Sequence, residues 1–397
     1  MYNFLAAFVI CAVIIIIGEI VTHLTNAWIP SVFVSAVVLL IGYWTVLPHD
    51  LVSHSVLIPF GATVGIFLLI THMGTVISLK RLIERWKTVV TCLVGLFGMC
   101  TFSYFVAPML MDRAFVIAGL PPLTGGIVAA TMMQQAATKA GLQAAAVFAI
   151  SMYCIQGFAG YPITAVCLKR EGKRLLAEYR SGKATINAAE KAAIDEVVKL
   201  PEESKKRLPL AIPDTYNSPI VMLAKLGFVA WLASMLGAVT GVSGAIWALV
   251  LGVVFCTAGF LDQDLLHKAN SYNIVMFALM MYVFDGLKDC TPEMLQHIIY
   301  PMVVLIVIGV VGMGVFAFIV SKILKLSFLM AFANCLTALY GFPFDAIITE
   351  STCDSLAETK EERDFLMSKM FPSMIVGGFT TVTITSVFIA GIFAKML

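Results

Sequence analysis

Along most of this chain, stretches of about 20 hydrophobic residues alternate with short polar segments. A helix of about 20 apolar residues is long enough to cross the hydrocarbon core of a bilayer. The pattern therefore predicts an all-α polytopic membrane protein with ten spans, five in each half. The expected spans cover residues 4–22, 31–47, 55–77, 88–110 and 146–168, and then 219–240, 243–260, 271–288, 299–324 and 366–394.

Two semi-polar stretches interrupt this pattern, one between the fourth and fifth span of each half. They cover roughly residues 120–142 and 326–350, and each combines proline and glycine with polar side chains. Non-helical backbone at membrane depth must be buried in protein or line a wet cavity, because lipid cannot satisfy its N–H and C=O groups. We therefore expect each stretch to form a re-entrant or broken-helix hairpin.

The fourth span and its counterpart in the second half repeat one sequence. The string VGLFGMCTFSYFVAPML begins at Val94, and IGVVGMGVFAFIVSKIL begins at Ile308, which is 214 residues later (308 minus 94). Two copies of a unit with an odd number of spans must lie upside-down to each other in the membrane. The chain is therefore expected to consist of two inverted five-helix repeats. The matched residues are Gly95, Gly98, Met99, Phe102, Val106 and Leu110, which recur as Gly309, Gly312, Met313, Phe316, Val320 and Leu324.

The two repeats are predicted to occupy residues 1–168 and 219–397, joined by a charged linker over residues 169–218. The linker holds eleven of the 26 basic residues, interleaved with acids, and the segment from Thr185 has the pattern of a short amphipathic helix. A connection between the halves is the simpler interpretation, and contact with lipid headgroups or a regulatory partner is the alternative.

Basic residues in short loops set the expected orientation, because such loops remain in the cytoplasm. Three basic clusters follow predicted spans, and all three lie in the cytoplasm only if neither hairpin crosses the membrane completely. Both termini are then outside, the linker is cytoplasmic, and the expected location is the inner (plasma) membrane. The first hairpin enters from outside and the second from the cytoplasm, as inversion requires. The basic clusters are Lys80, Arg81, Arg85 and Lys87; Lys169, Arg170, Lys173 and Arg174; and Lys322 and Lys325.

Composition supports the membrane assignment and narrows the chemistry. The chain is 60% hydrophobic and only 13% charged, and this composition excludes a soluble domain. Its net charge is +2. Its nine cysteines show no CxxC pair, and no phosphate loop, catalytic motif or nucleic-acid module occurs. We therefore expect no enzyme activity, no cofactor or resident metal and no nucleic-acid partner. His72 lies within an apolar stretch, where a packing role is expected.

The candidate binding residues are the polar and helix-breaking residues of the two hairpins. Broken helices that meet near the midplane would direct N–H dipoles at an anion and carbonyl groups at a cation, which suits a carboxylate carried with Na⁺ or H⁺. Asp345 is the best candidate for an ion ligand or proton acceptor, and the alternative is that it faces the cytoplasm beyond the hairpin. Lys139 could pair with a solute carboxylate, with Asp345 or with Glu350, or extend to the outer surface. The candidates are Thr124, Gly125, Gly126, Thr131, Gln134, Gln135 and Thr138 in the first hairpin, and Asn334, Thr337, Gly341, Pro343, Asp345 and Glu350 in the second.

Three short motifs resemble the bacterial glutamate:sodium symporter family. The segment TGGIVAAT from Thr124 resembles the Gly-Gly pair of that family's first hairpin, and Cys335 and Pro343 stand at the spacing of a cysteine and a proline in its second. The segment FPSMIVGGF from Phe371 resembles the start of its last span. The resemblance implies five plus five spans, sodium coupling, glutamate as a possible substrate and a homodimer. The sequence departs from the family at Ile127, where a histidine–glycine–threonine run would begin.

These features together predict a secondary active transporter. It would move a small anionic solute, an amino acid such as glutamate or another carboxylate, in symport with sodium by alternating access. The alternative is a proton-coupled carrier or exporter of another small solute, acting through Asp345 or Glu350. A channel would show pore-lining polar stripes or a repeated selectivity filter, and an intramembrane enzyme would need paired catalytic groups. The sequence shows neither.

Overall fold

The computed structural model describes residues 3–25, 29–76, 79–181, 217–341 and 344–397. Every regular element in these ranges is a helix. Seven helical segments are long and apolar enough to cross a membrane, and α2, α14 and α16, which are among the shorter apolar helices, lie where the other three spans are predicted. The predicted fold class, an all-α polytopic membrane protein, is confirmed.

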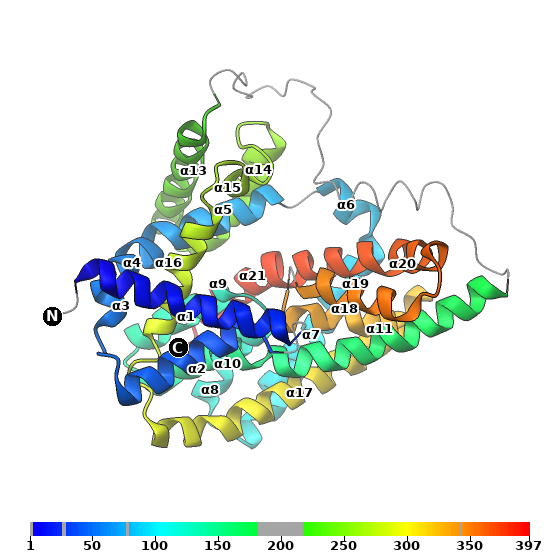
Figure 1. The fold of residues 1–397 in the computed structure, drawn as a ribbon, viewed down its shortest axis with the longest axis horizontal. Coiled ribbons are helices and arrows are strands. Elements are labelled where there is room, and N and C mark those ends of the chain that lie inside the picture. The colour runs from blue at the N-terminus through cyan, green and yellow to red at the C-terminus, as the bar shows by residue number, and fades with distance from the viewer. Residues whose placement is uncertain (1–2, 26–28, 77–78, 182–216, 342–343) are drawn as a thin grey trace.

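The first half contains five spans, and the fourth and fifth are separated by two shorter helices (Figure 1). The span helices are α1 (Phe4–Leu24); α2 (Ser31–Thr45); α3 (Leu51–His54), α4 (Leu57–Pro59), η1 (Phe60–Gly65) and α5 (Ile66–Val76); α7 (Trp86–Val106) with η2 (Ala107–Met109); and α10 (Gln143–Ile155) with α11 (Gly157–Arg180). The remaining helices are α6 (Leu79–Glu84) and the hairpin pair α8 (Arg113–Leu123) and α9 (Ile127–Lys139).

The second half follows the same order. Its span helices are α13 (Pro219–Thr240); α14 (Gly244–Thr257); α16 (Tyr272–Asp285); α17 (Pro292–Leu324); and α20 (Lys360–Gly378) with the π-helix η5 (Phe379–Thr385) and α21 (Ser386–Phe393). The short helix α15 (Leu265–Lys268) precedes α16. The second hairpin consists of α18 (Phe328–Leu336), η4 (Thr337–Leu339) and α19 (Phe344–Leu356).

The inverted repeat is visible where α7 crosses α17, the most extensive helix pair of the described residues. Gly98 packs against Phe316, and its repeat equivalent Gly312 packs against Phe102, which is the equivalent of Phe316. A Cβ atom added to either glycine would lie 2.6 Å from the Cβ of its phenylalanine, so the two helices approach closely. Because repeat equivalents exchange the same contacts across one antiparallel pair, α7 and α17 are related by a local two-fold axis at this crossing, as an inverted repeat predicts.

Contacts between distant segments separate two faces of the molecule. At one face, Asp264 N donates to Thr75 O and Lys225 pairs with Asp262. This face also carries the end of α11, from which the linker starts, and we call it the linker face. At the opposite face, Trp44 Nε1 donates to Cys290 O at 2.7 Å. The faces alternate along the chain as ten crossings require.

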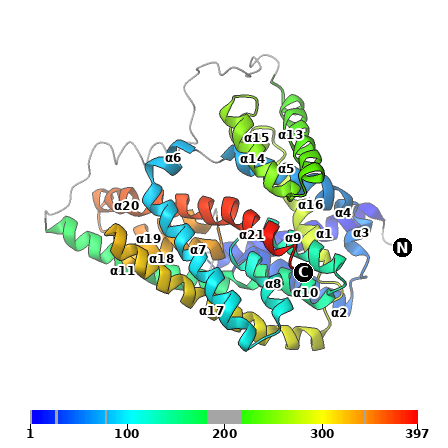
Figure 2. The ribbon, with the colours of Figure 1, turned by 180° about the vertical axis from the view of Figure 1, so that it is seen from behind.

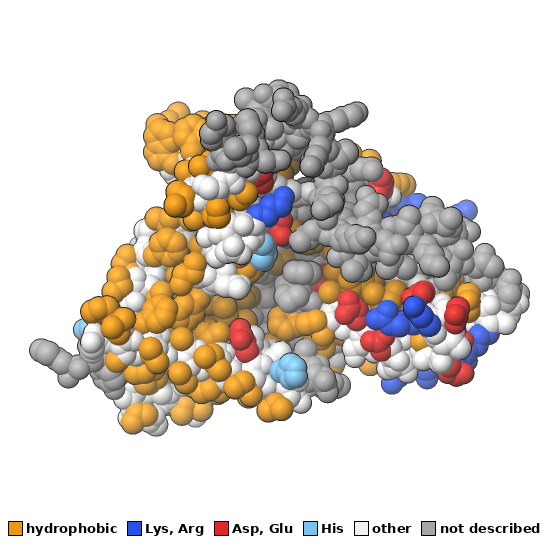
Figure 3. Space-filling model, turned by 45° about the horizontal axis from the view of Figure 1, so that its top comes forward, with side chains coloured by type: hydrophobic (Ala, Val, Ile, Leu, Met, Phe, Trp, Pro, Cys, Tyr) orange, Lys and Arg blue, Asp and Glu red, His pale blue; other side chains and the backbone are white. Residues whose placement is uncertain are grey.

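The helices form two lobes. The panel lobe contains α1 to α5 and α13 to α16, and the hairpin lobe contains α7 to α11 and α17 to α21. Each lobe therefore combines equivalent spans from both repeats. Figures 1 and 2 show α13, α14 and α15 diverging from α11 and α20. Figure 3 shows charged side chains gathered on the end of the hairpin lobe, where Arg180 pairs with Glu362, while hydrophobic side chains cover much of the rest.

Both hairpins are re-entrant, as contacts along α11 show for the second. Ser327, just before α18, donates to Glu171, whereas Leu339 at the tip packs on Gly160, and Leu356 at the end of α19 returns to Gly172. Both arms therefore pack along α11, and the hairpin returns to the linker face. In the first hairpin, α8 and α9 pack against each other and against α10.

The hairpin limits differ from those predicted. The first runs over Arg113–Lys139 rather than residues 120–142, because Pro121 and Pro122 fit into the last turn of α8 and the chain breaks only at residues 124–126. The second extends to Leu356.

The predicted linker also begins later than expected, since α11 continues to Arg180. The amphipathic helix predicted from Thr185 lies outside the described residues. The repeat and linker limits of 168, 169–218 and 219 otherwise remain predictions.

Candidate functional site

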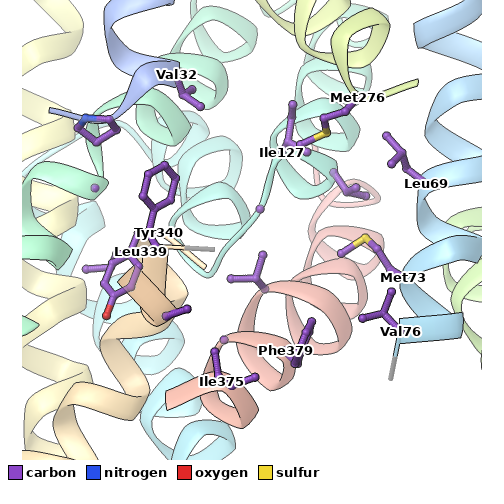
Figure 4. Close-up of a pocket in the computed structure, with 18 of the residues that line it drawn as sticks. Val32, Leu69, Met73, Val76, Ile127, Met276, Leu339, Tyr340, Ile375 and Phe379 are labelled. Carbon is purple, nitrogen blue, oxygen red and sulfur yellow. The ribbon is translucent and has the colours of Figure 1, made fainter. Parts of the chain in front are cut away.

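A cavity of about 800 Å³ lies between the two lobes. Figure 4 shows apolar side chains from both lobes directed towards this common space. Its wall extends from the hairpin tips, at Gly126 and Leu339, to residues of the linker face such as Val76 and His267. The cavity therefore reaches from the middle of the molecule to the linker face. The panel lobe contributes Leu69, Met73, Val76 and Met276, and the hairpin lobe contributes Ile127, Leu339, Tyr340, Ile375 and Phe379.

The tips of both hairpins meet at one residue of the last span. Gly126 of the first tip and Gly341 of the second have positive φ angles of 86° and 67°, which glycine adopts without steric cost. A Cβ atom added to Gly126 would lie 3.1 Å from Val382 Cγ1, and one added to Gly341 would lie 2.9 Å from Val382 Cγ2. The predicted convergence of the two broken stretches is therefore present, with Val382 of η5 between them.

The first tip presents a helix N-terminus to the cavity. Gly126 is the N-cap of α9 and has no side chain to cap it, and the next residues, Ile127 and Val128, line the cavity. The first N–H groups of a helix have no partner within the helix, and they carry the positive end of its dipole. This end of α9 can therefore bind an anionic group without a charged side chain.

The second hairpin contains a buried carboxyl group. Asp345 is 0% exposed, and its Oδ1 accepts a hydrogen bond from Ala346 N at 2.8 Å. Its Oδ2 has no hydrogen-bond partner within the described residues. A buried carboxylate without a compensating charge is costly, and a bound cation or a proton removes that cost. Asp345 therefore has the arrangement expected of an ion-binding or proton-binding group.

A network of buried oxygen atoms joins the same hairpin to the last span. Thr337 Oγ1 donates to Asn334 O at 2.6 Å and lies 3.2 Å from Thr381 Oγ1. Ser373 Oγ donates to Asn334 Oδ1 at 3.0 Å, and Thr381 Oγ1 donates to Gly377 O at 3.0 Å. The network lies beside η5, and π-helical segments occur frequently at functional sites. Carbonyl and hydroxyl oxygens of this kind can coordinate an alkali cation.

Most candidates of the first hairpin face other helices. Thr124 and Thr131 donate to the carbonyl groups of Pro121 and Ile127 in their own helices. Gln134 packs against Gly286, and Gln135 lies beside Tyr282. Thr138 is exposed, as is Lys139.

Two of the predicted candidates line the cavity, Gly126 and Glu350. Glu350, a predicted candidate of the second hairpin, is part of α19. Gly125, Gly341, Asn334 and Thr337 belong to the tips and the polar network, next to the cavity wall. Pro343 lies outside the described residues.

The sequence did not single out a polar cluster on the panel-lobe wall. Asp264 Oδ1 lies 2.6 Å from His267 Nδ1 and 3.6 Å from His72 Nε2, and all three residues line the cavity. His72 is packed as expected, with only 2% of the residue exposed. It also lines the cavity beside Asp264, which the predicted packing role did not include. The spacing of Asp264 and His267 could have suggested a pair on one helical turn, but His72 comes from a span almost 200 residues earlier.

The donor types of this cluster, two imidazoles and a carboxylate, are those of transition-metal sites. The hydrogen bonds favour another arrangement. Leu266 N donates to His72 Nδ1 at 3.2 Å, so the ring proton of neutral His72 lies on Nε2, the atom that faces Asp264. A protonated nitrogen offers no lone pair to a metal. The cluster therefore fits a hydrogen-bonded His267–Asp264 pair with His72 beside it better than a metal site.

Comparison with known proteins adds little to this geometry. No family model and no curated protein matches the chain. The sodium proton antiporter MjNhaP1 from Methanocaldococcus jannaschii is similar in structure, with 14% identity and a TM-score of 0.44 over 100% of this chain and 99% of that one. A likeness at this level carries no argument about function. The resemblance to glutamate:sodium symporters, with the glutamate specificity and homodimer that it implies, stays a hypothesis.

Proposed function

We propose that this protein is a secondary active transporter that moves a small anionic solute in symport with sodium by alternating access. The observation that carries the proposal is the convergence of both hairpin tips on Val382 beside a cavity of about 800 Å³ between two lobes. Secondary transporters built from inverted repeats bind solute and ion at broken helices between two such units.

The cavity wall suits a carboxylate with an apolar body. Most of its side chains are apolar, as Ile127, Met276 and Phe379 illustrate, and no Lys or Arg is among the described residues that line it. The uncapped N-terminus of α9 is the fixed positive dipole at the tip. A carboxylate bound there would leave the remainder of the solute in contact with apolar side chains.

The coupling ion is assigned to the second hairpin. Asp345 supplies a buried negative charge with a free Oδ2, and the network around Asn334, Thr337 and Thr381 supplies neutral oxygen ligands. A cation bound at one hairpin and an anion bound at the other would partly neutralise each other's charge. Binding of each ion would therefore favour binding of the other. This pairing is the physical basis proposed for symport.

Movement of the two lobes would provide alternating access. The cavity extends to the linker face, whereas on the other side of the tips the helices pack closely, as Gly119 against Phe148 illustrates. We propose that this arrangement is the state open to the linker face. Rocking of the hairpin lobe against the panel lobe would then expose the same site to the opposite face.

A proton-coupled carrier is the second candidate. The observation in its favour is that Asp345 needs only one proton to become neutral, and that Asp264 and Glu350 add two further carboxyl groups to the cavity wall. In this version, the proton replaces sodium at Asp345 while the solute site is unchanged.

Thermal stabilisation of the purified protein separates the two candidates. A ligand that binds only the folded state raises the melting temperature by mass action. The panel would contain carboxylates with apolar bodies, such as benzoate and phenylacetate, together with glutamate, each in Na⁺ and in K⁺ at several pH values. Sodium symport predicts a carboxylate shift that requires Na⁺, and Asp345→Asn should lose it while Asp354→Asn, an exposed control, keeps it. A shift in K⁺ that grows at low pH favours the proton-coupled carrier, and no shift under any condition contradicts both.

A further inference from the structure

The cavity wall opposite the hairpin tips contains a charge-stabilising arrangement that the proposed function does not yet use. His267 is half exposed, with 49% of its side chain accessible, whereas the carboxyl group of Asp264 beside it is nearly buried. The distance of 2.6 Å between His267 Nδ1 and Asp264 Oδ1 is that of a strong hydrogen bond. Because Nδ1 is engaged, Nε2 is the nitrogen of His267 that stays available to a ligand.

Several contacts fix the position of Asp264. Its backbone has a positive φ of 54°, and Asp264 N donates to Thr75 O. Leu266 N holds His72 Nδ1, which leaves the Nε2–H of His72 facing the same carboxylate oxygen. The carboxylate therefore cannot turn away from His267 without losing contacts to α5.

His267 is also held in place. Its ring stacks on Tyr272 with the centroids 4.1 Å apart and an angle of 24° between the planes. An imidazole held between an aromatic ring and a fixed carboxylate is pre-organised to meet a ligand at its free nitrogen. Such a histidine can carry a positive charge without moving.

We propose that protonated His267 is a binding residue for the anionic solute, so that solute binding takes up a proton at this residue. The inference rests on the proposed function. No Lys or Arg lines the cavity within the described residues, so a histidine is the side chain there that can carry a full positive charge. His72 is unsuited to this role because a cation at that position would place an N–H against Leu266 N–H.

The charged and titratable groups around His267 come from each element that surrounds it. His72 lies on α5, Asp264 precedes α15, Lys268 is on α15 and exposed, and Tyr272 begins α16. On α13, Lys225 is already paired with Asp262. Across the cavity, Glu350 of α19 is the facing acid. Among these groups, Asp264 is the one in hydrogen-bond contact with His267, and His72 Nε2 lies 3.6 Å from the same carboxylate oxygen.

The test measures binding of benzoate, as the probe, to the purified full chain by thermal shift between pH 5.5 and 8.5 in constant Na⁺. If binding requires the imidazolium, affinity on the alkaline side of its titration falls about tenfold for each pH unit. His267→Gln keeps a hydrogen-bond donor but cannot be protonated, so its benzoate affinity should be low and independent of pH. His267→Lys should bind benzoate with little pH dependence over this range. His54→Gln, an exposed histidine on α3, is the matched control and should behave as the wild type.

The outcomes separate this inference from the proposed function. A benzoate shift in the wild type that strengthens at low pH, and that loses its pH dependence in His267→Gln, supports the inference. A wild-type shift with the same pH dependence in His267→Gln overturns it and leaves the carboxylate transporter standing. No benzoate shift in the wild type at any pH overturns both.

Discussion

The two hairpins have the same topology but carry different chemistry next to the cavity. In the first, α8 and α9 pack together, and the tip offers backbone N–H groups at Gly126 with little side chain. In the second, both arms pack on α11, and the hairpin carries a buried carboxyl group at Asp345 and a network of oxygen atoms. The two hairpins share a backbone path because the hydrophobic pattern and the helix breaks recur in both repeats. This shared path leaves each tip free to specialise, and the proposed function assigns an anion to one copy and a cation to the other.

The largest expected effect comes from the carboxyl group that distinguishes the second hairpin. Asp345→Asn keeps the shape but removes the charge, and should weaken sodium binding by about 3 kcal/mol, or roughly 100-fold. The protein should remain folded, because Oδ2 has no partner to lose. Sodium-dependent thermal shift and uptake into proteoliposomes measure the change. Wild-type sodium dependence in this variant would remove the proposed difference between the hairpins.

The second prediction concerns the backbone of the first tip. Gly126 has φ 86° and ψ 147°, a conformation that non-glycine residues rarely adopt, so Gly126→Ala should cost about 1–3 kcal/mol of stability or distort the tip. Solute binding should fall with it. Gly227→Ala is the control, since that helical glycine has open space around it and the change should be neutral or stabilising by up to about 1 kcal/mol. Equal melting temperatures and equal solute affinities for the two variants would contradict the assignment of the solute site to the first tip.

A matched pair of threonines gives a smaller effect. Thr337→Val removes a hydroxyl from the polar network and should weaken sodium binding by about 1 kcal/mol, roughly fivefold. Thr131→Val in the first hairpin removes a hydroxyl that bonds only within its own helix, and sodium binding should change less than twofold, or about 0.4 kcal/mol. Sodium titrations of both variants measure the two affinities. A larger loss of sodium affinity in Thr131→Val than in Thr337→Val would contradict the assignment of sodium to the second hairpin.

The smallest effects are expected where the hairpins begin. Asp112 caps α8 through Ala114 N, and Ser327 donates to Glu171 at 2.6 Å. Asp112→Ala and Ser327→Ala should each lower stability by about 1 kcal/mol without changing solute or sodium affinity. Thermal unfolding with and without ligand measures this. A selective loss of ligand binding in either variant would indicate that the outer ends of the hairpins also contribute to the site.

Sequence alone determined the architecture, because spans and their repetition depend on local hydrophobic pattern. Ten apolar stretches, the repeat around Gly98 and Gly312, and the helix breaks near Gly126 and Gly341 were all readable before any fold was known. Bilayer thickness sets the length of a span, and the requirement to satisfy backbone polar groups sets where it can break.

Tertiary structure decided which polar residues share a space. Thr131, Gln134 and Gln135 have the composition of a binding helix, yet the Thr131 hydroxyl bonds within α9 and the two glutamines face α16 and the residues after it, since side-chain direction depends on how α9 packs. Conversely, nothing in the sequence indicated that His72 and His267 lie close together. Their segments are almost 200 residues apart and meet only through the packing of α5 against the loop before α16. Local pattern encodes which residues enter the membrane, whereas long-range packing fixes which of them face the cavity.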